Sequence, residues 1–207
     1  MIRRLAKSSS GASAAEFALI LPLFVLILLG IVDAGRFAWT WNRAEKAAQM
    51  GARMAVVTDV ISTGLGSYDF VQPGGLTQGD AIPQTAISPI TCTGDGVTTA
   101  TCTCTASGSA ICPTNFAVGD YRSFNRILFR MRNYVPELGA NKLQIIYTGS
   151  GLGYAGDPNG MDIAPLVTVR ILSLPFRPIS TLNLMSSNIT NISATLTAED
   201  SSGTQSN

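Results

Sequence analysis

The hydrophobic pattern is dominated by residues 17–32, a run of sixteen positions without a charged side chain. A short head that carries Arg3, Arg4 and Lys7 precedes this run. A basic head followed by an apolar run is typical of a membrane segment whose N-terminus stays in the cytoplasm. The pattern continues without a strong stop signal and predicts one long helix over residues 12–57. At about 1.5 Å per residue this helix is roughly 65–70 Å long, about twice the hydrocarbon thickness of a bilayer.

Beyond Asp33 the helical pattern becomes amphipathic, and one face of the predicted helix consists of small residues. Two interpretations of this face stay open. The chain's own domain covers it, or it allows a second element to approach the helix closely. The small residues of this face are Ala44, Ala47, Ala48, Gly51, Ala52 and Ala55.

Residues 58–119 are rich in Gly, Ser and Thr and contain all four cysteines, Cys92, Cys102, Cys104 and Cys112. Their spacing lacks the paired C-x2-C motifs of a zinc site. In an exported chain an even number of cysteines indicates disulfides, and here two would staple the insertion. A bridge between Cys102 and Cys104 would close too tight a ring. Two connectivities stay open: 92–102 with 104–112, or 92–104 with 102–112.

The last third of the chain, residues 120–199, combines helical and strand patterns. Apolar positions at helical spacing predict a second amphipathic helix from residue 121, ended by Pro136. We therefore expect an α+β fold, in which a long N-terminal transmembrane and amphipathic helix packs on a small antiparallel sheet. Residues 200–207 form a polar tail that we expect to be disordered. The strands of the sheet are predicted at residues 142–148, 166–172 and 189–198.

Composition argues against several classes of function. The formal net charge of the 207-residue chain is +1, so nothing indicates a nucleic-acid partner. The chain has no histidine, which removes His-based triads and the commonest metal ligand. A Ser–Lys site would have to use Lys7, Lys46 or Lys142, which are widely scattered. We expect no catalytic activity and no cofactor.

Glu16 is the anomaly of the N-terminal segment, because a carboxylate next to an apolar run is costly in a membrane. The cost is roughly 2.5–3.5 kcal/mol at the bilayer centre and less near the interface. A cleaved secretory signal would have a shorter apolar core, and the sequence around residues 30–35 is a mediocre cleavage site. A plain signal anchor fits the hydropathy but gives no role to Glu16 or to Gly11.

Residues 10–17 (SGASAAEF) account for both features. The basic leader, the glycine, the small residues, the glutamate and the aromatic residue before an apolar helix resemble the cleavage region of type IV prepilins. More closely, they resemble the TadE-like pseudopilins of the tight-adherence (Tad, type IVc) pilus system. The resemblance implies that a prepilin peptidase cuts between Gly11 and Ala12. Glu16 then becomes the fifth residue of the mature chain, next to Phe17, in the part of the helix that serves assembly.

The resemblance extends over about residues 8–57 and 165–199, whereas the middle of the chain shows none. In the first part it includes a glycine–arginine step and an alanine-rich segment, and in the second part it includes the closing strands. The matching segments are residues 31–37 (IVDAGRF), 42–44 (NRA), 47–55 (AAQMGARMA), 167–170 (VTVR), 175–178 (PFRP) and 194–198 (ATLTA).

The resemblance implies a minor pilin or pseudopilin that takes part in initiation or assembly of the Tad pilus. Its implied partners are the prepilin peptidase, the major pilin, other pseudopilins of the Tad system and inner-membrane lipid. Its implied location is the bacterial inner membrane, as a single-pass protein with a cytoplasmic N-terminus and a periplasmic C-terminal domain, or the pilus or cell surface after assembly. The alternative is a signal-anchored extracytoplasmic binding or scaffold protein that is not cleaved.

Overall fold

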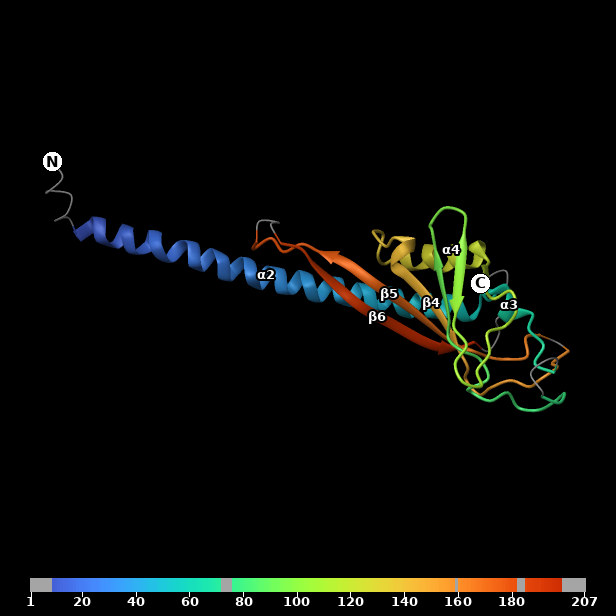
Figure 1. Cartoon of the computed structure of the whole chain (residues 1–207). Coiled ribbons are helices and arrows are strands. Elements are labelled where there is room, and N and C mark those ends of the chain that lie inside the picture. Colours follow the sequence, from blue (N-terminus) through green and yellow to red (C-terminus); the bar gives the residue numbers. More distant parts are fainter. Residues whose placement is uncertain (1–8, 72–75, 159, 182–184, 199–207) are drawn as a thin grey trace. The chain divides into compact units, whose positions relative to one another are not determined.

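The computed structural model describes residues 9–71, 76–158, 160–181 and 185–198. Within these residues the predicted α+β fold is confirmed, with a long N-terminal helix, an antiparallel sheet and a second helix (Figure 1). Two disulfides are also present. The predicted tail, residues 200–207, and most of the predicted leader lie outside the described residues. The elements in chain order are α2 (Ser9–Val56), α3 (Thr63–Gly66), β1 (Ile90–Gly94), β2 (Ala100–Cys104), β3 (Val118–Gly119), α4 (Tyr121–Arg132), the 3-10 helix η1 (Ala140–Lys142), β4 (Leu143–Thr148), β5 (Leu166–Phe176) and β6 (Ser187–Thr197).

The chain forms two compact units, which are described separately. The first unit combines Met1–Trp41 with Pro175–Asn188, and the second combines Asn42–Leu174 with Ile189–Asn207. Helix α2 and strands β5 and β6 each contribute residues to both units.

In the described part of the chain the sheet has six strands in the order β3-β2-β1-β4-β5-β6. The three strands predicted from the alternating pattern are β4, β5 and β6. The insertion supplies the other three, which the sequence did not predict, and β1 joins them to β4 in an antiparallel pair. Between β5 and β6 the hydroxyls of Thr168 and Thr195 lie 2.7 Å apart and share a hydrogen bond.

One face of the sheet is covered by helices in the second unit. The pairs Cys92↔Ile145 and Ile145↔Val169 align these three side chains across β1, β4 and β5, and all three are buried. Helix α4 packs over β1, where a Cβ on Gly94 would lie 2.4 Å from the ring of Phe124. The covered face is therefore the core of this unit.

The C-terminal part of α2 packs on the same core through its small residues. Ala44, Ala48 and Ala52 have no exposed surface. A Cβ on Gly51 would lie 2.6 Å from Sδ of Met131 on α4 and 3.1 Å from Cγ1 of Val169 on β5, so any larger residue would have to displace these neighbours. The chain's own domain therefore covers the small-residue face, and α4 and β5 of that domain approach the helix closely there.

The disulfides join Cys92 to Cys102 and Cys104 to Cys112. This is the first of the two connectivities that the sequence left open. Cys92 and Cys102 are directly paired across β1 and β2, so the first bridge lies within the main sheet. Asp95 lies in the turn that connects β1 to β2 and helps to close it.

The Asp95 carboxylate accepts backbone N–H bonds from Val97, Thr98 and Thr99. These bonds, that of Thr99 above all, hold the pKa of Asp95 below its usual range.

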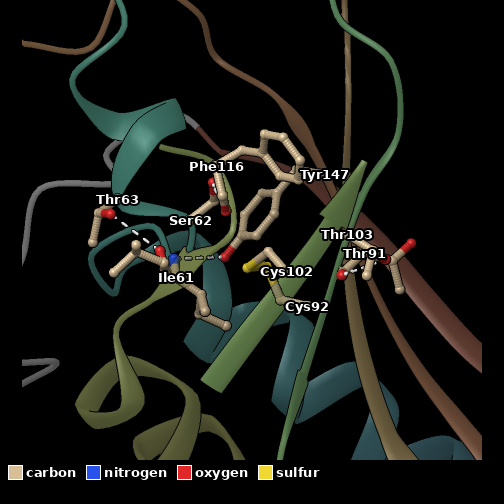
Figure 2. Close-up of a disulfide and its surroundings, with 10 residues drawn as sticks. Ile61, Ser62, Thr63, Thr91, Cys92, Cys102, Thr103, Phe116 and Tyr147 are labelled. Carbon is tan, nitrogen blue, oxygen red and sulfur yellow. Dashed lines mark hydrogen bonds between the residues drawn. A yellow bond between two sulfur atoms is a disulfide. The ribbon is translucent and has the colours of Figure 1, made fainter. Parts of the chain in front are cut away.

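Tyr147 connects the sheet to the segment that follows α2. Its hydroxyl accepts a hydrogen bond from the backbone N–H of Ile61 at 3.1 Å, and the ring lies beside the Cys92–Cys102 disulfide (Figure 2). Burial raises the pKa of Tyr147 above its ordinary value. The buried hydroxyl of Tyr147 thus has a hydrogen-bond partner in the segment that follows α2.

Candidate membrane and assembly segment

The residues predicted at the cleavage site lie inside a helix. Helix α2 begins at Ser9, so Gly11 and Ala12 belong to its first turns rather than to an extended leader. Serine and glycine are poor helix formers, and the first backbone N–H groups of any helix lack partners within it. These two features lower the stability of this end of α2.

Glu16 and Phe17 lie two turns into α2, and both side chains are exposed. Among the described residues, none forms a hydrogen bond or ion pair with Glu16. Its carboxylate thus stands at the beginning of the apolar run without a partner from this part of the chain.

The apolar run of α2 exposes its side chains all around. Phe17 is 65% exposed and Leu19 is 80% exposed, whereas the alanines of the same helix in the second unit are buried. By length and composition α2, with a candidate span of Ser13–Val56, is the helix in the described part of the chain that could cross a membrane. The contrast between its two ends indicates that the exposed surface belongs to lipid or to other protein chains.

Asp33 is the main residue of this segment whose role the sequence did not reveal. It directly follows the apolar run, yet only 7% of it is exposed. Its Oδ1 accepts the backbone N–H of Ile179 at 2.8 Å, and its Oδ2 accepts the backbone N–H of Ser180 at 2.7 Å. The carboxylate therefore holds the turn between β5 and β6 against α2 within the first unit. We call residues 177–181 the hairpin tip.

Arg36, one turn after Asp33, makes a second set of contacts with the hairpin. Its Nη1 donates to Asp33 Oδ1 at 3.0 Å and to the backbone oxygen of Arg177 at 3.3 Å. The guanidinium carbon also lies 5.6 Å from the centre of the Phe176 ring, within cation–π range. Phe37 packs edge-on against the same ring, with 5.4 Å between ring centres. A charge pair and an aromatic pair thus join helix and hairpin.

The sequence indicated that Asp33 has a partner, but it did not indicate the contact with the hairpin tip. A lone acidic residue that directly follows sixteen uncharged positions should have a partner, and Arg36 at i+3 is one. The backbone groups at Ile179 and Ser180 are 146 and 147 residues away. No local pattern connects positions at such a separation.

A metal-binding arrangement is not found in the described residues, where no group of three or more His, Cys, Asp or Glu side chains could hold an ion. The carboxylate of Asp162, which lines a cavity of about 440 Å³, accepts backbone N–H bonds from Phe70, Gly156 and Asp157. Asp162 thereby joins two loops, and both of its carboxylate oxygens accept backbone hydrogen bonds.

Comparison with known proteins bears on the segment just described. The family model of the TadE-like proteins matches residues 11–53. This segment is similar to the TadE-like family. The match begins at the predicted cleavage glycine and includes Glu16, Asp33 and the buried small-residue face.

The TadE-like match leaves most of the chain uncovered. The predicted resemblance of residues 165–199 lies outside it and stays a prediction. Neither the curated proteins nor the solved structures include a significant match to this chain. The second unit, with its disulfide-linked strands, is therefore described by its own geometry alone.

Proposed function

We propose that this chain is a TadE-like minor pilin or pseudopilin that takes part in initiation or assembly of the Tad pilus. The observation that carries the proposal is the coincidence of three features in one segment. The TadE-like match begins at Gly11, the helix it covers exposes an apolar surface, and an exposed carboxylate stands at the start of that surface.

In this proposal α2 anchors the protein in the bacterial inner membrane, with its N-terminus in the cytoplasm and the second unit in the periplasm. The basic residues before the apolar run favour this orientation. The bilayer holds the apolar surface until assembly, when neighbouring helices replace the lipid. The same surface thus stays out of water before and after assembly.

A prepilin peptidase would cut between Gly11 and Ala12. A protease takes its substrate in an extended form, so the first turns of α2 must open before the cut. The weak helix formers Ser9, Ser10 and Gly11 lower the cost of opening. The cut would create a new α-amino group at Ala12, four positions before Glu16.

Glu16 would then pair with the α-amino group of a neighbouring subunit. In an interface that excludes water, removing one member of such a pair costs roughly 3–5 kcal/mol. A carboxylate that only faces lipid headgroups would instead contribute about 0.3–1 kcal/mol through its own helix N-terminus. We propose no catalytic role for this chain, and its contribution to the pilus is structural.

Substitution of Glu16 tests the proposal. Glu16→Leu should leave membrane insertion intact and abolish crosslinking to the major pilin, whereas Glu16→Asp, which keeps the charge, should retain part of it. Both are measured in one membrane preparation, by fractionation and by crosslinking. Unchanged crosslinking of Glu16→Leu would instead favour a signal-anchored binding or scaffold protein.

A further inference from the structure

The hairpin tip lies against α2 at the position where the apolar run ends. Asp33, which holds Ile179 and Ser180, is the residue that follows position 32. A helix needs about 20 residues to cross the hydrocarbon of a bilayer, at about 1.5 Å per residue. The sixteen uncharged residues before Asp33 are slightly fewer than that. If α2 spans a membrane, Asp33 and the hairpin tip therefore lie at the boundary between hydrocarbon and headgroups.

Four polar backbone groups of the hairpin tip have partners in the protein. The N–H groups of Ile179 and Ser180 donate to Asp33, and the oxygen of Arg177 accepts from Arg36. Pro178 has no N–H, and its oxygen accepts the hydroxyl of Thr181 at 3.2 Å. Backbone enters an apolar medium only when such groups are satisfied. An ordinary solvent-exposed turn has no need of this, because water would serve the same groups.

The side chains around the tip suit a lipid interface. Ile179 is 40% exposed and Met185, on the other side of the turn, is 67% exposed. Among residues 17–41 and 175–188 the only charged side chains are Asp33, Arg36 and Arg177. The Asp33 side chain is only 9% exposed, whereas that of its partner Arg36 is 45% exposed, so the charge that faces outward is positive and suits the phosphates of lipid headgroups.

We propose that the hairpin tip is a second membrane contact of this protein. It dips into the interface of the leaflet where the apolar run of α2 ends, held there by the Asp33 carboxylate. Ile179 of the tip and Met185, just beyond it, reach the acyl boundary, and Arg36 and Arg177 meet the headgroup phosphates. The inference rests on the membrane anchoring by α2 that the proposed function includes.

The test measures the depth of single tryptophans in vesicles that contain brominated phosphatidylcholine. The full chain, with Trp39→Phe and Trp41→Phe, carries one new tryptophan at a time. Met185→Trp reports on the hairpin, Ile20→Trp reports on the apolar run, and Phe129→Trp reports on a 69% exposed position of α4 in the second unit. All three replaced side chains are exposed, so the substitutions should not disturb folding.

We expect lipid brominated near the headgroup to quench Met185→Trp several-fold more than Phe129→Trp. Lipid brominated deep in the acyl chain should quench Ile20→Trp most. Addition of Asp33→Ala should lower the quenching of Met185→Trp towards that of Phe129→Trp and leave Ile20→Trp unchanged.

Three results would contradict the inference in distinguishable ways. Quenching of Met185→Trp no greater than that of Phe129→Trp, while Ile20→Trp is quenched, rejects the second contact and leaves the anchor standing. Absence of quenching at Ile20→Trp rejects the anchor itself, and with it both the second contact and the membrane part of the proposed function. Quenching of Met185→Trp that survives Asp33→Ala rejects the role of Asp33 in holding the tip.

Discussion

The carboxylate of Asp33 accepts a hydrogen bond from the backbone N–H of Ile179, 146 residues further along the chain, at 2.8 Å. The same carboxylate also accepts from Ser180. Asp33 thus fixes the turn between β5 and β6 to the helix that carries the apolar run. A side chain at the end of a membrane-type segment is here a structural partner of the C-terminal strands.

Replacement of Asp33 should release the hairpin tip. We expect Asp33→Ala to accelerate hydrogen exchange at the amides of Ile179 and Ser180, because both lose their acceptor. Asp33→Asn keeps one acceptor oxygen and should give intermediate rates. The amide of Ile61, which donates to Tyr147 in the second unit, serves as an internal reference and should not change. Equal exchange at Ile179 in all three proteins would contradict the assigned contact.

Gly35 and Gly51 form a matched pair within α2. A Cβ on Gly35 meets nothing within 4 Å, whereas a Cβ on Gly51 meets Met131 and Val169. Gly51→Leu should therefore lower the free energy of unfolding by about 1–3 kcal/mol through overpacking. Gly35→Leu should leave it unchanged or raise it by up to about 1 kcal/mol, because leucine favours a helix more than glycine does. Chemical denaturation of both variants in the same detergent gives the comparison.

If Gly51→Leu were as stable as Gly35→Leu, α2 would not pack on α4 and β5 as described.

The fold divides into parts that the sequence predicted and parts that it could not. Strands β4–β6 and helix α4 follow from regular alternation and from helical spacing ended near Pro136. Strands β1 and β2 (ITCTG and ATCTC) also alternate, but with Thr, Cys and Gly in place of large apolar residues. Their signal is weak because Ile90 is the one large apolar residue in these two strands, and small residues and the paired Cys92 and Cys102 fill the rest of the covered face.

The candidate site shows the same division. Gly11, Glu16 and the apolar run form a contiguous pattern, which made the TadE-like resemblance recognisable, and the family match over residues 11–53 confirms it. The contact of Asp33 with the hairpin depends on a fold that brings residues 33 and 179 together. The choice between the disulfide connectivities likewise required the register of β1 and β2, which pairs Cys92 with Cys102.

The two disulfides should differ in their contribution to stability. Each closes a short loop, with sequence separations of 10 and 8, so removal of either pair should cost about 2.5–3 kcal/mol in chain entropy. Cys92 and Cys102 are in addition buried within the sheet. We therefore expect the double replacement Cys92→Ala with Cys102→Ala to lower the unfolding free energy more than Cys104→Ala with Cys112→Ala.

Alkylation of the exported protein without prior reduction checks the cysteines directly. Mass spectrometry should find no labelled thiol at any of the four positions. Labelling of all four cysteines, or zinc retained after purification, would contradict the disulfide assignment and would indicate a metal or redox site.

The intact mass of the protein isolated from membranes tests the central claim most directly, because the pilin-type role requires a defined N-terminus. In a strain with its own prepilin peptidase the mature chain should begin at Ala12, and a bulky residue at position 11, as in Gly11→Leu, should leave the leader attached. A mass that retains residues 1–11 in the unaltered protein, or one that corresponds to cleavage after Ala34, would contradict the account.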